Sequence, residues 1–237
     1  MKMTKDGKAQ TAGKTKKLGV LAGKFIVFDG LDGCGKTTQL DFLEEILTKN
    51  GITVRRVRDP GGTSIGEQIR EILLTSKGDG MSIRTEMLLY MASRAQLVSE
   101  EIKPALQNKQ TVLSDRFTSS TLAYQGAAGG LEPKEITQVA EAATEGLWPD
   151  LTIIMDIPVE LAMTRMQSTA KRGHGAQPGL FHDRIETRVA DFHRRVREGF
   201  LEQVKKYPEK YRLVSAAGTR EDTQNAINTV MTEFFKL

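Results

Sequence analysis

The sequence predicts an α/β fold, in which a doubly wound parallel sheet of five strands lies between helices in a three-layer arrangement. Three observations lead to this prediction. Apolar segments of strand length alternate with segments of helical hydrophobic period along most of the 237 residues. A glycine-rich loop of the pattern G-x-x-x-x-G-K-[ST] separates the first strand from the first helix. Charged residues directly follow several strands, where open parallel sheets bind their ligands.

The predicted elements can be taken in chain order. The five strands are expected at residues 24–28, 52–58, 111–115, 151–157 and 211–215. The helix after the glycine-rich loop has one apolar face and ends at Asn50-Gly51, because asparagine and glycine favour helix ends. A second helix carries apolar residues at helical spacing between 65 and 73. A longer helix over 82–107 follows, in which Pro104 marks a kink or an end.

The glycine-rich loop predicts a site for a nucleoside triphosphate. Its glycines let successive backbone N–H groups turn toward phosphate oxygens, and the N-terminus of the following helix attracts the same anion. Lys36 adds a mobile positive charge for the terminal phosphates, and Thr37 offers a hydroxyl to Mg²⁺. ATP and Mg²⁺ are therefore the expected ligands, held by Gly30, Leu31, Asp32, Gly33, Cys34, Gly35, Lys36, Thr37 and Thr38.

The positive charge of the chain is concentrated at its N-terminus. The formal net charge is +4, but residues 1–17 hold six lysines against one aspartate, about +5, which leaves the rest near −1. We therefore expect residues 1–22 to be a basic, disordered extension and residues 23–237 to form one domain. The extension is interpreted as solubilising or as a start-site artefact, with weak anion contact and targeting as alternatives. Nucleic-acid binding is not expected of the remaining, non-basic chain.

The single cysteine, Cys34, excludes an intrachain disulfide and a multi-cysteine zinc site. Its position at a helix N-terminus is consistent with a reactive thiol or with a small filler of the loop. The apolar runs are too short to cross a bilayer, and no secretory signal is recognisable. The sequence thus predicts a cytoplasmic protein without a membrane partner.

Two charged residues follow the third strand. Asp115 lies where a carboxylate organises Mg²⁺ in many phosphate-loop enzymes, so Thr37 and Asp115 form the predicted metal site. Arg116 is expected to face a phosphate, because its planar guanidinium can bind two phosphate oxygens at once. Asp59, after the second strand, should reach the same crevice.

These residues belong to a longer series of motifs. Their order and content resemble those of the thymidylate kinase family, whose members phosphorylate dTMP to dTDP. Besides the loop, the series includes Arg58-Asp59-Pro60-Gly61-Gly62-Thr63, Ala92-Ser93-Arg94, Lys103-Pro104-Ala105-Leu106, Asp115-Arg116-Phe117, Ala123-Tyr124-Gln125-Gly126, Pro149-Asp150-Leu151-Thr152 and Asp183-Arg184-Ile185-Glu186. The resemblance covers roughly residues 25–200 and implies a fold of the P-loop nucleoside monophosphate kinase type.

The resemblance also implies the site for dTMP. Tyr90 matches the aromatic residue that stacks on thymine, and Arg94, Thr121 and Gln125 match positions that contact the base. Tyr124 matches the aromatic residue that crowds the sugar and selects deoxyribose. The remaining predicted contacts are Asp32 with the 3′-hydroxyl, Arg70 and Arg116 with the acceptor phosphate, and Asp59 near that phosphate and the metal. Bacterial relatives usually have glutamate at position 59, one methylene longer.

The resemblance further implies a mobile lid around residues 168–184. One branch of the family places its key arginine in the phosphate loop, where this chain has Gly33, and the other places it in the lid. The transferring charge is therefore expected from Arg165, Arg172 or Arg184, with Arg172 the first choice. Lys36, Arg116, Arg172 and Arg184 are the predicted catalytic residues.

Alternative functions remain open at this stage. A nucleoside monophosphate kinase of broader base specificity shares most of these features. A nucleotide-dependent switch protein is the alternative from another class, although the only Asn-Lys pair, Asn108-Lys109, lacks the aspartate of a guanine-recognition motif. The family resemblance also implies a homodimer.

Overall fold

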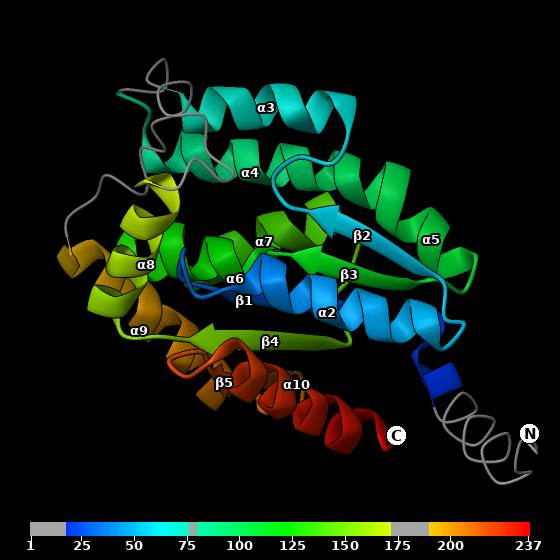
Figure 1. Ribbon diagram of the computed structural model, residues 1–237. Helices are drawn as coiled ribbons and strands as arrows, with labels where there is room; N and C mark the ends of the chain where they lie inside the picture. Colours follow the sequence, from blue (N-terminus) through cyan, green and yellow to red (C-terminus); the bar gives the residue numbers. More distant parts are fainter. Residues whose placement is uncertain (1–17, 76–79, 172–189) are drawn as a thin grey trace, which may run out of the picture.

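The computed structural model describes residues 18–75, 80–171 and 190–237 (Figure 1). A parallel sheet lies at its centre. Its strand order is β2-β3-β1-β4-β5, and all neighbouring strands are parallel. The strands are β1 (Phe25–Gly30), β2 (Val54–Arg58), β3 (Thr111–Asp115), β4 (Leu151–Asp156) and β5 (Tyr211–Ser215). The predicted five-stranded parallel sheet is confirmed.

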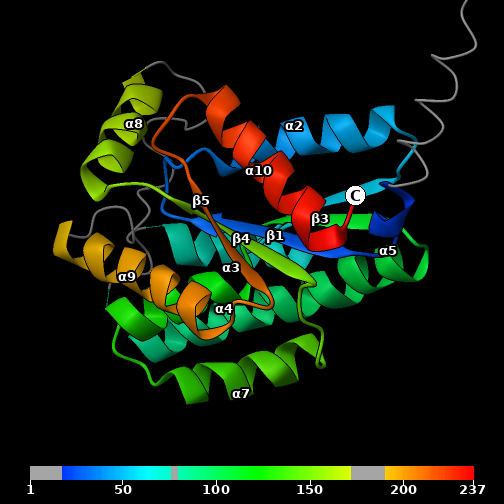
Figure 2. The ribbon, with the colours of Figure 1, turned by 90° about the horizontal axis from the view of Figure 1, so that it is seen from below.

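Helices cover both faces of the sheet, which gives the three predicted layers (Figure 2). One face carries α2 (Lys36–Lys49) and α10 (Arg220–Phe235), which contact each other. The opposite layer contains α4, α5 and α9, and α7 packs on the outer side of α4. The remaining bounds are α3 (Ser64–Leu74), α4 (Ile83–Leu97), α5 (Lys103–Gln107), α6 (Thr118–Thr121), α7 (Pro133–Thr144), α8 (Val159–Lys171) and α9 (Ala190–Lys206).

The central strand β1 is buried along its whole length. Successive side chains of a strand point to opposite faces, so Ile26 and Phe28 join the larger hydrophobic cluster while Phe25 and Val27 join the smaller one. A strand that is covered on both sides is expected to be continuously apolar. This burial fixes β1 firmly, and the phosphate loop begins at its carboxyl end.

Two predicted elements differ from the structure by more than small shifts at their ends. The helix expected over 82–107 is divided into α4, a π-helical segment (Val98–Ile102) and α5. The backbone nitrogen of Pro104 cannot donate a hydrogen bond, and the wider π turn before it lets the chain remain helical. The second strand starts at Val54, because the Ile52 N–H still donates to the Leu47 carbonyl at the end of α2, at 3.0 Å.

The described residues include 18–22, which the sequence analysis assigned to the N-terminal extension. Gly19–Leu21 forms a short 3₁₀ turn, and Leu21 is fully buried in the core. The Thr111 hydroxyl donates to the Leu21 carbonyl at 2.8 Å, which ties this turn to β3. Within the described ranges, no helix has the length and apolar character needed to span a membrane.

Candidate active site

The phosphate loop connects β1 to α2 through a backbone that requires glycine at several positions. Gly33 and Gly35 have φ values of +79° and +92°, which side chains with a Cβ atom rarely adopt. The buried Lys36 folds back over the loop, and its Nζ donates to the carbonyls of Leu31 at 3.1 Å and Gly30 at 3.3 Å. These weak, replaceable bonds leave the ammonium group ready for phosphate oxygens.

Gly33 also brings the loop against α8. A Cβ atom at this position would lie 2.6 Å from the Ala162 carbonyl oxygen and 3.1 Å from Cγ of Met166. No side chain, and in particular no arginine, fits here unless α8 moves. Packing against α8 therefore requires glycine at position 33, where one branch of the family has its loop arginine.

Cys34, which follows Gly33 at an unspecified position of the glycine-rich pattern, is buried within the loop. Burial raises the pKa of its thiol above the ordinary value, although the nearby Lys36 acts in the opposite direction. A protonated, inaccessible thiol fits a small filler of the loop better than a reactive nucleophile.

Thr37 and Asp115, the predicted metal site, are adjacent. The Thr37 hydroxyl donates to Oδ2 of Asp115 at 3.1 Å, although the two residues belong to different elements. Hydroxyl and carboxylate oxygens are ligands that Mg²⁺ prefers, and Mg²⁺ usually takes few protein ligands and completes its shell with water and phosphate. No cluster of three or more His, Cys, Asp or Glu residues suited to a metal occurs in the part of the chain that the structure describes. The pair therefore fits Mg²⁺ that is bound together with a nucleotide.

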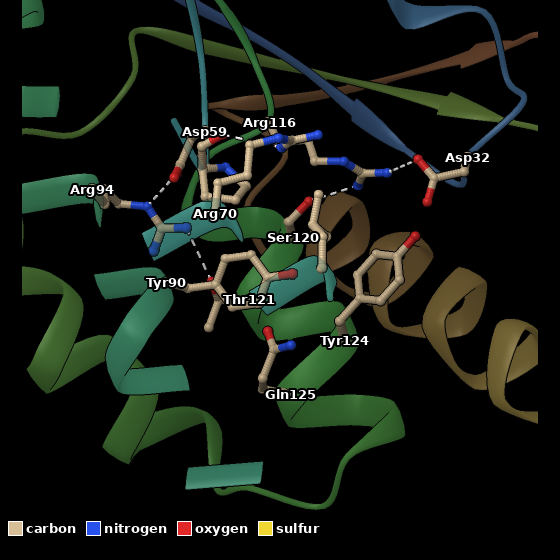
Figure 3. Close-up of a pocket in the computed structure, with 12 residues that line it drawn as sticks. Asp32, Asp59, Arg70, Tyr90, Arg94, Arg116, Ser120, Thr121, Tyr124 and Gln125 are labelled. Atoms are coloured by element: carbon tan, nitrogen blue, oxygen red, sulfur yellow. Dashed lines mark hydrogen bonds and ion pairs between the residues drawn. The ribbon is translucent and has the colours of Figure 1, made fainter. Parts of the chain in front are cut away.

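A pocket lies beside the loop, and all nine residues predicted to bind the acceptor substrate line it (Figure 3). They come from the phosphate loop, the ends of β2 and β3, α3, α4, α6 and the π-helical segment Leu122–Ala128. Pro60, Leu74 and Ser120 complete the lining. The nine are Asp32, Asp59, Arg70, Tyr90, Arg94, Arg116, Thr121, Tyr124 and Gln125.

Arg116 is held at the mouth of this pocket by several acceptors. Its Nη1 donates to Oγ of Ser120 at 2.8 Å and to Oδ1 of Asp29 at 3.2 Å, and its Nη2 pairs with Asp32. The guanidinium also lies over the Tyr124 ring, 5.3 Å from the centroid. A guanidinium fixed in this way presents a charge in a defined direction to an incoming phosphate.

Asp32 is a permanently charged acceptor in this setting. Burial opposes its ionisation, but Arg116 and Lys36 outweigh burial and lower the pKa of its carboxyl to about 2. The carboxylate can therefore accept a hydrogen bond from a hydroxyl group, but it cannot act as a general base near neutral pH.

Arg94 is buried on the opposite wall of the pocket, with 1% of its surface exposed. Its Nε donates to Oδ2 of Asp59 at 2.5 Å, and its Nη2 donates to the Thr121 hydroxyl at 3.1 Å. Burial raises the pKa of Asp59, and the guanidinium of Arg94 opposes that rise. The carboxylate of Asp59 thus faces Arg94, although the residue lines the pocket beside the loop as well.

Sequence reasoning missed two acidic residues that support the site. Asp29, fully buried at the end of β1, accepts hydrogen bonds from the hydroxyls of Ser119 at 2.6 Å and Ser120 at 2.7 Å. Glu86, also buried, accepts one from Nε2 of Gln125 at 2.8 Å. An acidic residue within an otherwise apolar strand was the signal for Asp29, whereas the first-turn position of Glu86 in α4 resembles ordinary helix charge patterning.

A larger cleft on the other side of the loop continues to α8 and the β5–α10 connection. Arg165 lines it and donates to the Ala216 carbonyl at 2.8 Å. Most of the expected lid, including Arg172 and Arg184, lies outside the described residues. The cleft and the acceptor pocket share one wall, which consists of Asp32, Asp59, Arg70 and Arg116.

Comparison with known proteins identifies relatives of this chain. Residues 28–227 match the family model described as thymidylate kinase. The chain is 48% identical over 191 residues to the thymidylate kinase of Thermoanaerobacter sp. strain X514, an alignment that covers 81% of this chain and 88% of the relative. It is 42% identical over 209 residues to the thymidylate kinase of Geotalea uraniireducens, with 88% and 96% covered.

A solved structure agrees with these matches. The crystal structure of thymidylate kinase from Ehrlichia chaffeensis superposes with a TM-score of 0.66 at 32% identity, and 90% of this chain and 97% of the other are covered. Residues 28–227 contain the sheet except for the start of β1, together with the phosphate loop and the acceptor pocket. By sequence and by fold, this chain belongs to the thymidylate kinase family.

Proposed function

We propose that this chain transfers the γ-phosphoryl group of ATP to the 5′-phosphate of dTMP, giving dTDP and ADP. The observation that carries the proposal is the shared wall between the phosphate-loop cleft and the acceptor pocket, which contains Arg70 and Arg116. Two phosphates that bind from opposite sides would meet there, next to fixed positive charges. Family membership supports the same reaction.

On the donor side, the loop Gly30–Thr38 would hold the ATP phosphates through backbone N–H groups and Lys36. The Thr37 hydroxyl and the Asp115 carboxylate would hold Mg²⁺, which when bound neutralises charge on the donor phosphates. Lys36 would exchange the loop carbonyls to which it donates for oxygens of the β- and γ-phosphates.

On the acceptor side, each group of the pocket has a separate task. Tyr90 would stack on the thymine ring, and Arg94, Thr121 and Gln125 would contact its polar edge. Tyr124 would crowd the sugar at C2′, and the charged carboxylate of Asp32 would accept a hydrogen bond from the 3′-hydroxyl. Arg70 and Arg116 would hold the 5′-phosphate.

The transfer itself needs positioned cations more than proton transfer. Negative charge spreads over the equatorial oxygens of the transferred group, and the acceptor phosphate is already a nucleophile near neutral pH. Lys36 and Arg116 supply charge from the described residues. Arg172 and Arg184 are proposed to add charge from the lid, since packing against α8 keeps position 33 without a side chain.

The Arg116→Ala variant tests this assignment. Loss of the guanidinium removes one of the two positive charges at the shared wall, so kcat/KM for dTDP formation from ATP and dTMP should fall at least about 100-fold. The matched control is Arg212→Ala, because Arg212 lies on β5 and bonds to the Tyr211 carbonyl, away from both hollows. Activity of Arg116→Ala equal to that of the control would contradict the proposal.

The proposal includes a cytoplasmic homodimer. Ile65 and Ile72 on α3 and Leu88 on the neighbouring α4 each expose close to half of their surface, 50%, 47% and 49% respectively. Ile65 and Ile72 are seven residues apart and so share one face of their helix. Large exposed apolar side chains on adjacent helices favour burial against a second copy of the chain.

A further inference from the structure

Glu86 has no role in the proposed reaction, yet it is buried beside the acceptor pocket. Only 1% of its surface is exposed, and burial of a carboxylate is costly unless hydrogen bonds compensate. Its Oε1 accepts from Nε2 of Gln125 at 2.8 Å. Gln125 is equally buried and lines the pocket, so this bond joins Glu86 to the predicted base contact.

The chemistry of the pair fixes the orientation of the Gln125 amide. A carboxylate only accepts hydrogen bonds, so the amide nitrogen must be the atom that faces Glu86. The oxygen is on the other branch of the planar amide and is therefore turned away from the carboxylate. Figure 3 shows the Gln125 side chain rising from its helix toward Thr121 and Tyr90. Gln125 thus offers its oxygen, an acceptor, on the side of the base.

Arg94 contributes hydrogen-bond donors to the same pocket. A guanidinium has donors and no acceptor, and Arg94 is held by Asp59 at 2.5 Å and Thr121 at 3.1 Å. The pocket therefore combines a fixed donor with a fixed acceptor. Thymine and uracil present an oxygen acceptor, O4, next to a donor, N3–H. Cytosine presents the reverse, with an amino group at position 4 and an acceptor nitrogen at position 3.

We infer that Glu86 is a positioning residue for base selection: it holds the amide of Gln125 with its oxygen toward the base and so excludes cytosine from the pocket. The inference rests on the proposed function, because it takes a pyrimidine nucleoside monophosphate as the acceptor. Cytosine places its donor against Arg94 and its acceptor against the Gln125 oxygen. Two buried polar contacts are then mismatched, a strong basis for rejection.

The Glu86→Gln variant tests the inference by kinetics with three substrates. A glutamine at position 86 can accept or donate, so the Gln125 amide is able to turn over. We expect kcat/KM for dTMP to fall about tenfold, mainly through KM, and the preference for dTMP over dCMP to fall about 100-fold. The preference for dTMP over dUMP should not change, because thymine and uracil share the same polar edge.

The matched control is Glu135→Gln, which removes a carboxylate from α7 that pairs with Arg84 near the start of α4. Its substrate preferences should equal those of the wild type. An equal fall in kcat/KM for all three substrates in Glu86→Gln would overturn the inference, because that pattern indicates a purely structural role. Absence of dTMP-dependent ADP release in the wild type would instead contradict the proposed function.

A measurement on the wild type covers the case in which Glu86→Gln does not fold. dTMP methylated at N3 lacks the donor that the Gln125 oxygen requires. Its kcat/KM should be at least about 100-fold below that of dTMP. Equal use of the two substrates would overturn the inference, since the amide oxygen would then not face N3.

Discussion

Arg165 is the one candidate for the transferring charge that lies among the described residues. Its guanidinium lines the donor cleft but donates to the carbonyls of Ala216, Gly218 and Ala217, at 2.8, 3.3 and 3.4 Å. These bonds tie α8 to the chain that follows β5. Arg165 links these two segments in the structure, and Arg172 stays the first choice for the lid charge, with Arg184 next.

The Arg172→Ala variant should therefore lower turnover strongly, by about 100-fold or more, while dTMP binding changes little. The reason is that charge on the transferred group develops in the transition state and not in the bound substrate. Steady-state kcat and the dissociation constant of dTMP measure the two quantities separately. Wild-type turnover would exclude Arg172, and Arg184→Ala would be tested next.

The identities of the site residues could be predicted from the sequence, but several of their partners could not. Arg94 and Gln125 follow recognisable motifs, and both line the acceptor pocket. Their supporting acids are Asp59, the residue after β2, and Glu86 of α4, and only the packing of these elements places them beside their partners. A one-dimensional pattern contains the residue types but not these contacts between distant segments.

At the scale of elements, the contact between the phosphate loop and α8 is the most restrictive. Gly33 has a φ of +79°, and the space that a Cβ atom would need is occupied by the Ala162 carbonyl. The sequence contains the glycine, but its packing partner lies more than a hundred residues away. The π-helical segments Val98–Ile102 and Leu122–Ala128 were equally unpredictable, because their hydrophobic spacing resembles that of an α-helix.

The variants Gly33→Ala and Gly51→Ala separate backbone strain from this contact. Both glycines have a φ of +79°, but no atom lies within 4 Å of a Cβ atom at Gly51. Gly51→Ala should cost about 1 kcal/mol of unfolding free energy from the left-handed conformation alone. Gly33→Ala should cost about 1–3 kcal/mol more, from the clash with α8. Urea unfolding of the nucleotide-free proteins measures the two losses of unfolding free energy. Equal losses would show that a side chain at position 33 does not clash with α8.

In the whole molecule, α3 and α4, which carry the exposed Ile65, Ile72 and Leu88, lie at the opposite end of the view from α10 (Figure 1). Arg70 and Leu74 of α3 line the acceptor pocket, as do Tyr90 and Arg94 of α4. A dimer through these helices would therefore stabilise the walls of the substrate site without covering the phosphate loop.

The Ile72→Glu variant tests the dimer surface. A charge in the centre of an apolar interface opposes association, so the variant should sediment as a monomer of 26.2 kDa while the wild type sediments at twice that mass. Leu213→Glu on β5 is the control, because Leu213 is exposed to a similar extent, 44%, and lies far from α3 along the sheet. A dimeric Ile72→Glu variant would place the interface elsewhere.

The pocket beside the phosphate loop is proposed to select dTMP as the phosphoryl acceptor. ADP release from ATP and Mg²⁺, measured in parallel with dTMP, dUMP, dCMP and dGMP, tests this selection. We predict the highest kcat/KM with dTMP, a value within about tenfold for dUMP, which lacks only the methyl group, and values at least about 100-fold lower for dCMP and dGMP. Comparable rates with dCMP or dGMP, or no release with dTMP, would contradict the account.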